Sequence, residues 1–353
     1  MRAVGLVERP DHVCCRYRVR AYTSELESRG WRVELRPLMS SLLERLYTLR
    51  DDHAADVVLL QRKLLDAFRL RLLRYNARRL VFDFDDAVLY RDSYATKGPL
   101  CPRRSTRFRR VVQFADAVVA GNAFLAEQAA QFTDHDRIHV VPTCVNPARY
   151  PELARHDATE SVQMVWIGSS STLRGLVVAT PLFEAIGRYV PGLQFKVICD
   201  SFPTFDRLPV MPVFWTEPTE AHELARADIG ISWLPDDLWS RGKCGLKILQ
   251  YMAAGLPVVA NSVGVHAEMV EHGRSGFLVE TKSDWIEAIS TLAADPELRR
   301  AMGRYGRQIV EQRFNVSRWA PALDQILGGA AARASAETET VRTTPVLEPA
   351  LAG

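Results

Sequence analysis

Short apolar segments alternate with amphipathic segments along most of this chain, and this pattern predicts strands alternating with helices. In the first half the predicted strands are residues 3–7, 32–38, 56–61, 80–84, 117–120 and 138–142. The predicted helices between them are residues 17–29, 63–77, 108–115 and 123–132. In the helix at 63–77, the predicted core side consists of Leu64, Leu65, Phe68, Leu72 and Leu73.

The same alternation continues in the second half. Strands are predicted at residues 162–168, 195–199, 229–234, 257–261 and 276–279, with helices from 177, at 220–226, 245–254 and 284–311, and at 318–327. Strands that alternate with helices favour parallel sheets. We therefore predict an α/β protein with two doubly wound, Rossmann-like units, residues 1–150 and 151–312. Ligands of such sheets bind beyond the carboxyl ends of the strands.

Composition places the chain among ordinary globular proteins. Of its 353 residues, 47% are apolar and 25% are charged, and no run of eighteen apolar residues predicts a membrane-spanning helix. The first residues contain too short an apolar stretch for a secretory signal. The six cysteines have neither C-x-x-C nor zinc-site spacing, so we expect free thiols and a cytoplasmic protein. The tail at 329–353 lacks periodicity and is predicted to be disordered.

Charge is divided unevenly between the two halves. Residues 1–150 carry 26 Lys and Arg against 18 Asp and Glu, while residues 151–353 carry 19 against 24. Much of the excess lies in 62–79 and 103–110, which suits an anionic partner such as lipid head groups or a phosphorylated acceptor. A solvated helix face is the plainer alternative. No nucleic-acid motif and no interleaved aromatic side chains accompany the charge, so a nucleic-acid partner is not expected.

The most informative segment is residues 235–260, PDDLWSRGKCGLKILQYMAAGLPVVA. Two of the six lysines of the chain, Lys243 and Lys247, lie four residues apart at the start of its predicted helix, beside Gly242 and Gly245. Glycines let backbone N–H groups approach a ligand, and a helix N-terminus next to two ammonium groups attracts anions. The segment therefore predicts a phosphate site.

Residues 252–260, MAAGLPVVA, resemble part of the motif E-x7-E-A-M-A-x-G-x-P-V-V-A of retaining family 4 glycosyltransferases, which have the GT-B fold. Gly242 and Gln250 stand where this family has its two glutamates. The resemblance implies two Rossmann-like domains that face a cleft, a nucleoside-diphosphate sugar as donor, and no metal or other cofactor. It also implies that Gln250 binds the donor ribose and that a last helix, at 313–328, crosses back to the first domain.

The resemblance extends to other donor-binding positions. The turn Gly168–Gly175 resembles the family turn G-R-L-x-x-x-K-G, although Ser169 replaces the arginine. This implies that the donor diphosphate lies near Gly168, Ser169, Ser170, Arg174, Lys243, Gly245 and Lys247. By the same resemblance Asp200, Trp215 and Glu268 line the donor site, with Trp215 near the base and Glu268 facing the sugar.

A group of carboxylates, Asp83, Asp85 and Asp86, follows the predicted strand at 80–84. Carboxylates crowded at the end of a buried strand repel one another, and such crowding favours a functional role. The family resemblance places Asp85 and Asp86 near the reacting sugar, where a carboxylate accepts or orients the acceptor hydroxyl. Asp85, Asp86 and Lys247 are therefore the predicted catalytic residues. Arg16, Tyr17 and Arg18 follow the first strand and are predicted to meet phosphate or acceptor.

These features together predict a glycosyltransferase that acts on the hydroxyl of a glycan, a lipid-linked molecule or a small molecule. Peripheral contact with the inner face of an anionic membrane is a further expectation. Two alternatives stay open: a nucleotide-sugar binding protein without catalysis, and a magnesium-dependent phosphatase. The second rests on the D-x-D of haloacid-dehalogenase phosphatases, with Asp83 as nucleophile and Asp85 as acid. Asp86-Ala87 in place of Gly-Thr, and the position on the fourth strand, count against it.

Overall fold

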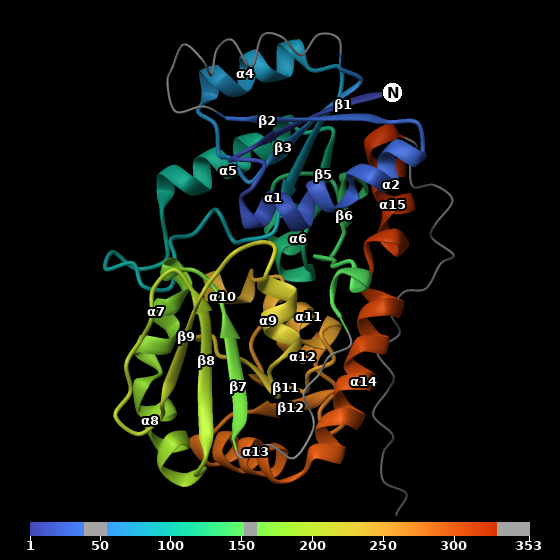
Figure 1. The fold of residues 1–353 in the computed structure, drawn as a ribbon. Helices are drawn as coiled ribbons and strands as arrows, with labels where there is room; N and C mark the ends of the chain where they lie inside the picture. The colour runs from blue at the N-terminus through green and yellow to red at the C-terminus, as the bar shows by residue number, and fades with distance from the viewer. Residues whose placement is uncertain (39–54, 152–160, 330–353) are drawn as a thin grey trace, which may run out of the picture.

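The computed structural model describes residues 1–38, 55–151 and 161–329, which form two parallel six-stranded sheets, one above the other in Figure 1. The strands of the first sheet are, in spatial order, β2 (Arg32–Pro37), β1 (Arg2–Val7), β3 (Val57–Gln61), β4 (Leu80–Phe84), β5 (Ala117–Ala120) and β6 (Ile138–Val140). Every neighbouring pair is parallel. Strands β3 and β4 are buried at every residue, as expected of central strands with helices on both faces.

Helices cover the two faces of the first sheet unequally. Because crossovers between parallel strands are right-handed, α4 (Ala67–Asn76), α5 (Pro102–Phe114) and α6 (Ala123–Ala130) lie on one face. Their buried residues share one core cluster, which includes Leu73, Phe108 and Leu125. The opposite face is covered by α1 (Val13–Arg18), the short 3-10 helix Arg20–Tyr22, α2 (Thr23–Ser28) and α15 (Val316–Gly328).

The second sheet repeats this plan. Its strands are, in spatial order, β12 (Gly276–Val279), β11 (Val258–Asn261), β10 (Ile229–Ser232), β7 (Val162–Ile167), β8 (Leu193–Cys199) and β9 (Val210–Phe214). One face packs against α7 (Ser170–Val178), α8 (Thr180–Tyr189) and α13 (Lys282–Ala294). The other packs against α9 (Glu220–Ala225), α11 (Leu246–Ala253) and α14 (Pro296–Arg313). Two one-turn helices, α10 (Leu238–Arg241) and α12 (His266–Met269), lie in the loops after β10 and β11.

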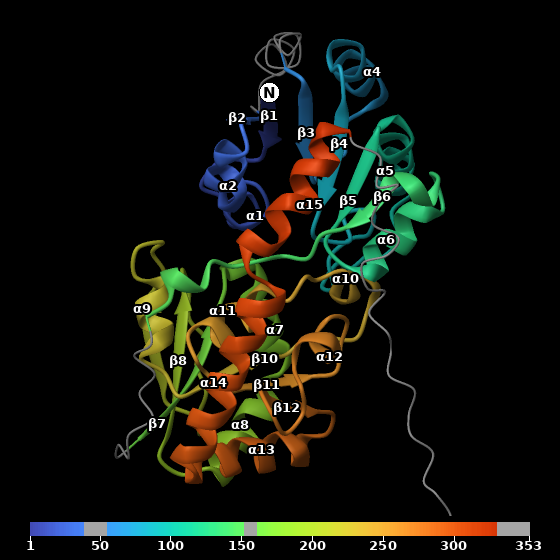
Figure 2. The same ribbon diagram turned by 90° about the vertical axis from the view of Figure 1, so that its right-hand side faces the viewer.

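The C-terminal helix α15 packs on the first sheet rather than the second (Figure 2). Its side chains Ala320 and Leu323 share a core cluster with Tyr22 and Leu26. The indole N–H of Trp31 donates to Asp324 Oδ1 at 2.7 Å, which fixes the helix along this face. Helix α14 packs on the second sheet and α15 on the first, so these consecutive helices join the two halves a second time. Residues 152–160, between the two halves, and residues 330–353 of the predicted tail lie outside the described residues.

Several predicted helix boundaries were wrong. Helix α4 begins at Ala67 because Asp66 caps it, with Oδ1 accepting from the backbone N–H of Arg69 at 3.1 Å. As a result Phe68, predicted to face the core, is 66% exposed, and Leu70, which was not predicted there, is buried; Leu73 is buried as predicted. Helix α5 begins at Pro102, six residues before the predicted start. The helix predicted at 17–29 is divided into α1, the 3-10 helix and α2, and the helix predicted from 177 begins at Ser170.

Candidate functional site

The start of α11 lies between the two sheets, and its geometry depends on Gly245. This N-cap residue has φ +64°, in the left-handed region that favours glycine. A Cβ at this position would lie 2.4 Å from Met269 Sδ, so space as well as conformation excludes a larger residue. The helix then begins at Leu246 and carries Lys247 in its first turn.

Lys247 is a cation with no ionic partner within the described parts of the chain. Its Nζ lies over the ring of Trp166, 5.2 Å from the centroid. Burial and the positive charge of Lys243 lower the pKa of Lys247 to about 8, and the carboxylate of Asp86 only partly opposes this. An anion placed beside Lys247 would raise this pKa and be attracted in turn. The ammonium group is therefore prepared to bind a negative ligand.

Lys243 reaches across to the first half and joins it to the second. Its Nζ lies 2.8 Å from Asp86 Oδ1, and the guanidinium of Arg62 binds the other oxygen of the same carboxylate. Burial opposes the ionisation of Asp86, but the cations of Lys243 and Arg62 outweigh it and hold the pKa of Asp86 below its usual value. Asp86 is thus an ionised carboxylate held by one cation from each half.

Asp85 is held less completely. Its Oδ1 lies 3.4 Å from Arg62 Nε and is buried without a hydrogen-bond partner. Arg62 itself has φ +57°, an unusual conformation for a residue other than glycine, and such strain is concentrated at functional sites. The carboxylate of Asp85 therefore retains an oxygen that can accept a hydrogen bond.

Oxygens of Asp85 and Asp86 and the Sγ of Cys14 lie within 4.8 Å of one another, a grouping that can bind a metal ion. The guanidinium of Arg62 contacts all three side chains. A cation already occupies the centre of this grouping, which removes the electrostatic demand for a metal ion there.

The two halves touch closely around Gly242, the position of the first family glutamate. A Cβ on Gly242 would lie 2.6 Å from the Cβ of Ala87, so the backbone of the first half fills the space that a side chain would need. Next to it, Cys244 belongs to the core of the first half and lies against Gly121. Asn122 Nδ2 donates to the carbonyl oxygen of Lys243 at 3.1 Å. The close contact between Gly242 and Ala87 explains why position 242 is a glycine.

Gln250, the predicted ribose-binding residue, is 4% exposed and donates its amide N–H to Tyr17 Oη at 3.0 Å. Tyr17 Oη in turn donates to Glu220 Oε1 at 2.6 Å. Glu220 also accepts from Arg16, with 2.7 Å between Nη2 and Oε1, and from the indole of Trp215 at 2.8 Å. Arg16, Tyr17, Trp215 and Gln250 are thus brought together, around a glutamate that the sequence analysis did not select.

Arg18, by contrast, lies away from this group. Its guanidinium forms a buried ion pair with Asp83 and donates to the carbonyl oxygen of Val141 at 2.6 Å. Asp83 is 3% exposed, and burial raises its pKa despite the neighbouring arginine. A phosphatase nucleophile must reach its substrate, so the enclosed carboxylate of Asp83 gives no support to that alternative.

The turn after β7 was predicted to lie beside the donor diphosphate, but in the structure its polar groups are bound by an aspartate of the protein. Asp200 Oδ1 accepts from the backbone N–H of Ser170 at 2.6 Å, and its Oδ2 accepts from the Ser170 hydroxyl at 2.9 Å. Ser169 forms a capping box with Thr172. A Cβ on Gly168 would lie 2.2 Å from the ring of Trp166, which accounts for this glycine. Asp200 therefore holds the N-terminus of α7, and a phosphate there would have to displace it.

Arg174 points toward the first half. Its guanidinium carbon lies 5.2 Å from the centroid of the Tyr94 ring, which belongs to the loop after Asp85 and Asp86. The sequence analysis did not select Tyr94, Arg62 or Glu220. The crowding of three aspartates was the signal that pointed to a cation such as Arg62, but it could not tell which arginine supplies it.

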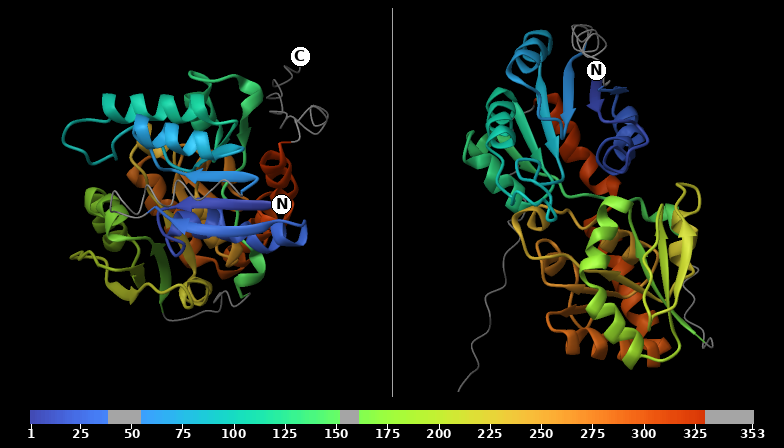
Figure 3. Two further views of the ribbon diagram at one scale, coloured as in Figure 1. Left: turned by 90° about the horizontal axis from the view of Figure 1, so that it is seen from above. Right: turned by 90° about the vertical axis from the view of Figure 1, so that its left-hand side faces the viewer.

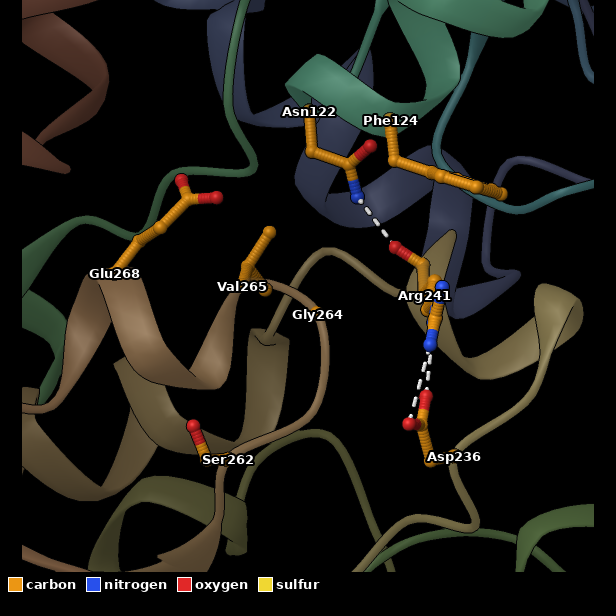
Figure 4. Close-up of a pocket in the computed structure, with 8 residues that line it drawn as sticks. All are labelled: Asn122, Phe124, Asp236, Arg241, Ser262, Gly264, Val265 and Glu268. Atoms are coloured by element: carbon orange, nitrogen blue, oxygen red, sulfur yellow. Dashed lines mark hydrogen bonds and ion pairs between the residues drawn. The ribbon is translucent and has the colours of Figure 1, made fainter.

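Glu268 lines a separate cavity of about 280 Å³ between the two halves (Figure 4). Asn122 and Phe124 line it from the first half, and Arg241 pairs there with Asp236 at 2.8 Å. The lining residues are Asn122, Phe124, Asp236, Arg241, Ser262, Gly264, Val265 and Glu268. Neither Lys243 nor Lys247 lines this cavity.

Comparison with known proteins bears on the segment that carries the lysines. Residues 232–309 match the family model of glycosyl transferases group 1. Alpha-maltose-1-phosphate synthase of Mycolicibacterium smegmatis is 26% identical over 259 residues, which cover 62% of this chain. The matched region spans 64% of that relative's length, less than two thirds.

Solved structures show the same fold. Sucrose-phosphate synthase of Thermosynechococcus elongatus superposes with a TM-score of 0.72 at 16% identity, covering 92% of this chain and 97% of that one. Anabaena HepE in complex with UDP and glucose gives a TM-score of 0.64 at 17% identity, covering 93% of this chain and 100% of that one. The chain has the GT-B fold, as the sequence predicted. Within the described residues, no helix has the length and apolar character needed to cross a membrane.

Proposed function

We propose that this protein transfers a sugar from a nucleoside-diphosphate sugar to an acceptor hydroxyl. One observation carries the proposal: Lys247, without an ionic partner among the described residues, lies beside Lys243 at the start of α11, and Lys243 is paired there with Asp86 of the first half. This segment lies within the match to glycosyl transferases group 1. The GT-B fold and the relatives' names add support to the assignment.

The donor diphosphate is assigned to the first turn of α11. Its negative charge would meet the Lys247 ammonium and the backbone N–H groups that follow Gly245. Negative charge grows on the diphosphate as the sugar leaves, so preorganised cations lower the barrier. Lys243 adds a second ammonium. In this proposal Ser169, Ser170 and Arg174 reach the diphosphate from the turn after β7 once Asp200 releases Ser170. In this proposal side chains neutralise the leaving group, and no metal or other cofactor is required.

The nucleoside is assigned to the group around Gln250 and Trp215. Trp215 is 37% exposed, so part of its ring is available to a base. The Gln250 amide reaches a ribose hydroxyl only after it exchanges its hydrogen bond with Tyr17. Donor binding would therefore separate Tyr17 from Gln250. Asp200 and Glu268 belong to the outer parts of this donor site in our proposal.

The acceptor is assigned to Asp85 and Asp86. Asp85 Oδ1 has no hydrogen-bond partner among the described residues, but it is buried beside Arg62, so Arg62 would have to move before this oxygen could accept the hydrogen of an incoming hydroxyl. Asp86 holds Lys243 beside the reacting centre. The resemblance to retaining family 4 enzymes leads us to propose that the anomeric configuration is retained.

Calorimetric titration of the purified protein with nucleoside diphosphates and their sugars, in the presence of EDTA, tests the proposal. We expect one nucleotide to bind, and Lys247→Ala to weaken it by about 10- to 100-fold, since a charged hydrogen bond is lost. Lys282→Ala is the matched control, because Lys282 is an exposed lysine in the first turn of α13. Equal affinity of Lys247→Ala and wild type would refute the assigned diphosphate site. A separate activity assay with added acceptors tests the reaction itself. Consumption of the donor without any transfer of its sugar to an acceptor would refute the transferase assignment.

A further inference from the structure

The outer layer formed by α4 and α5 is the most basic surface that the elements of the first half create. Both helices cover the same face of the first sheet and lie side by side, as Figure 3 shows from above. Together they contain eight arginines and no aspartate or glutamate. Their inward sides are apolar, through Leu70 and Leu73 on α4 and Val111 on α5. The arginines are therefore concentrated toward solvent.

Aromatic side chains lie among these arginines on α4. Phe68, Arg71 and Tyr75 are exposed and follow one another at intervals of three and four residues, so they share one side of the helix. Phe68 is 66% exposed and Tyr75 is 84% exposed. This arrangement overturns the expectation that no aromatic residue is interleaved with the charge.

Helix α5, which lies beside α4, supplies arginines that have no acidic partner among the described residues. Arg103, Arg109 and Arg110 are exposed on α5, and like Arg71 they form no ion pair with any residue that the structure describes. We name the set Phe68, Arg71, Tyr75, Arg103, Arg109 and Arg110 the α4–α5 face. It combines large exposed rings with four unpaired guanidinium groups.

We propose that the α4–α5 face docks on an anionic lipid bilayer. Guanidinium groups are attracted to the negative head groups, and aromatic rings partition into the interface just below them. Leu100, two residues before the start of α5, is 66% exposed. A leucine side chain has no π-face for a nucleobase to stack on, so its presence favours acyl chains over nucleic acid. The docking does not depend on the proposed transferase activity.

Flotation with vesicles tests this proposal. The full chain is mixed with phosphatidylcholine vesicles that contain about one third phosphatidylglycerol, or with phosphatidylcholine alone. We expect binding to the anionic vesicles only, weakening as salt rises. The triple variant Arg103→Ala, Arg109→Ala, Arg110→Ala is expected to lose at least about tenfold in partitioning. The matched control Arg188→Ala, Arg304→Ala, Arg318→Ala removes the same charge from exposed positions on α8, α14 and α15 and is expected to bind as wild type.

A second variant tests the contribution of the aromatic rings separately from that of the charge. Phe68→Ser with Tyr75→Ser keeps every arginine and should reduce vesicle binding severalfold, because the rings no longer enter the interface. Circular dichroism verifies that each variant is folded. Equal loss in both triple variants would overturn the proposal, since net charge rather than this face would then govern binding. So would binding to duplex DNA by the α4–α5 face with no binding to anionic vesicles.

Discussion

Lys243 Nζ lies 2.8 Å from Asp86 Oδ1, and this ion pair joins the second half of the molecule to the first. Both residues were selected from the sequence as parts of the site, one for the donor and one for the acceptor. A diphosphate that attracts Lys243 would loosen its hold on Asp86, so occupation of the donor site would alter the acceptor site. The pair thus gives the proposed mechanism a physical link between its two substrates.

Asp86→Asn should destabilise the protein by about 1–3 kcal/mol, because it leaves the partly buried cations of Lys243 and Arg62 without their shared carboxylate. Urea unfolding at pH 7 measures this. Asp236→Asn is the control, since Asp236 pairs with Arg241 at an exposed position and should cost less than about 1 kcal/mol. Equal losses of unfolding free energy in the two variants would show that Asp86 stabilises the protein no more than an exposed ion pair does.

The same carboxylate predicts a pH dependence of stability. The pKa of Asp86 is lowered in the folded protein, so its contribution is complete above the unfolded value and is lost as pH falls toward the folded one. The wild type should therefore lose more stability than Asp86→Asn between pH 5 and pH 3, within the acidic window that carboxylates govern. Parallel stability profiles for the two proteins would contradict the assignment.

Donor affinity should fall as pH rises through about 8, the pKa of Lys247. An anion binds the protonated amine, so binding weakens where that proton is lost, by up to about tenfold per pH unit. Lys247→Arg should bind the nucleotide without this alkaline loss, because arginine stays charged. Calorimetric titration of both proteins with the nucleotide, at a series of pH values from neutral to alkaline, measures this affinity. A wild-type affinity that is constant up to pH 9 would exclude Lys247 from the diphosphate site.

Gly242→Ala should destabilise the contact between the halves by about 1–3 kcal/mol, since its methyl group would overlap Ala87. Gly242→Glu, which restores the residue of the family motif, should separate the halves and raise the radius of gyration in solution scattering. Gly328→Ala is the control, because a Cβ there meets nothing within 4 Å. If Gly242→Glu stayed as compact and stable as wild type, the close contact with Ala87 would not exist in solution.

Tyr17→Phe should cost about 1–3 kcal/mol in unfolding free energy, because Glu220 loses a buried donor and Gln250 loses its acceptor. Tyr305→Phe removes the same hydroxyl from a bond to Glu271 at a more exposed site and should cost less. If Tyr17 leaves Gln250 when the ribose enters, Tyr17→Phe should also bind the donor at least as tightly as wild type. Loss of donor binding in this variant would instead assign Tyr17 to direct contact with the nucleotide.

Much of the fold followed from periodicity alone. The segments at β3 and β4 are rich in valine, leucine and phenylalanine and are bounded by polar residues, which favours buried strands. The segment from Gly245 to Asn261 was equally clear, because a cap glycine, a helical face and a short strand follow in order. Helix starts were less certain. Asp66 and Pro102 set them through local capping, which competes with the apolar period that the prediction relied on.

The sequence by itself determined the alternating parallel architecture, the placement of Lys243 and Lys247 at the start of a helix, and the placement of the aspartate cluster at the end of a strand, because all three depend on local spacing. The tertiary structure decided which of these groups meet. Arg62 lies more than twenty residues before Asp86, and Glu220 lies more than two hundred after Tyr17, yet each is a direct partner. The first pair is fixed by the pairing of β3 with β4 within one sheet, and the second by how the two halves face each other. The environment they create, rather than the residue types alone, sets the charge of Asp86 and Lys247.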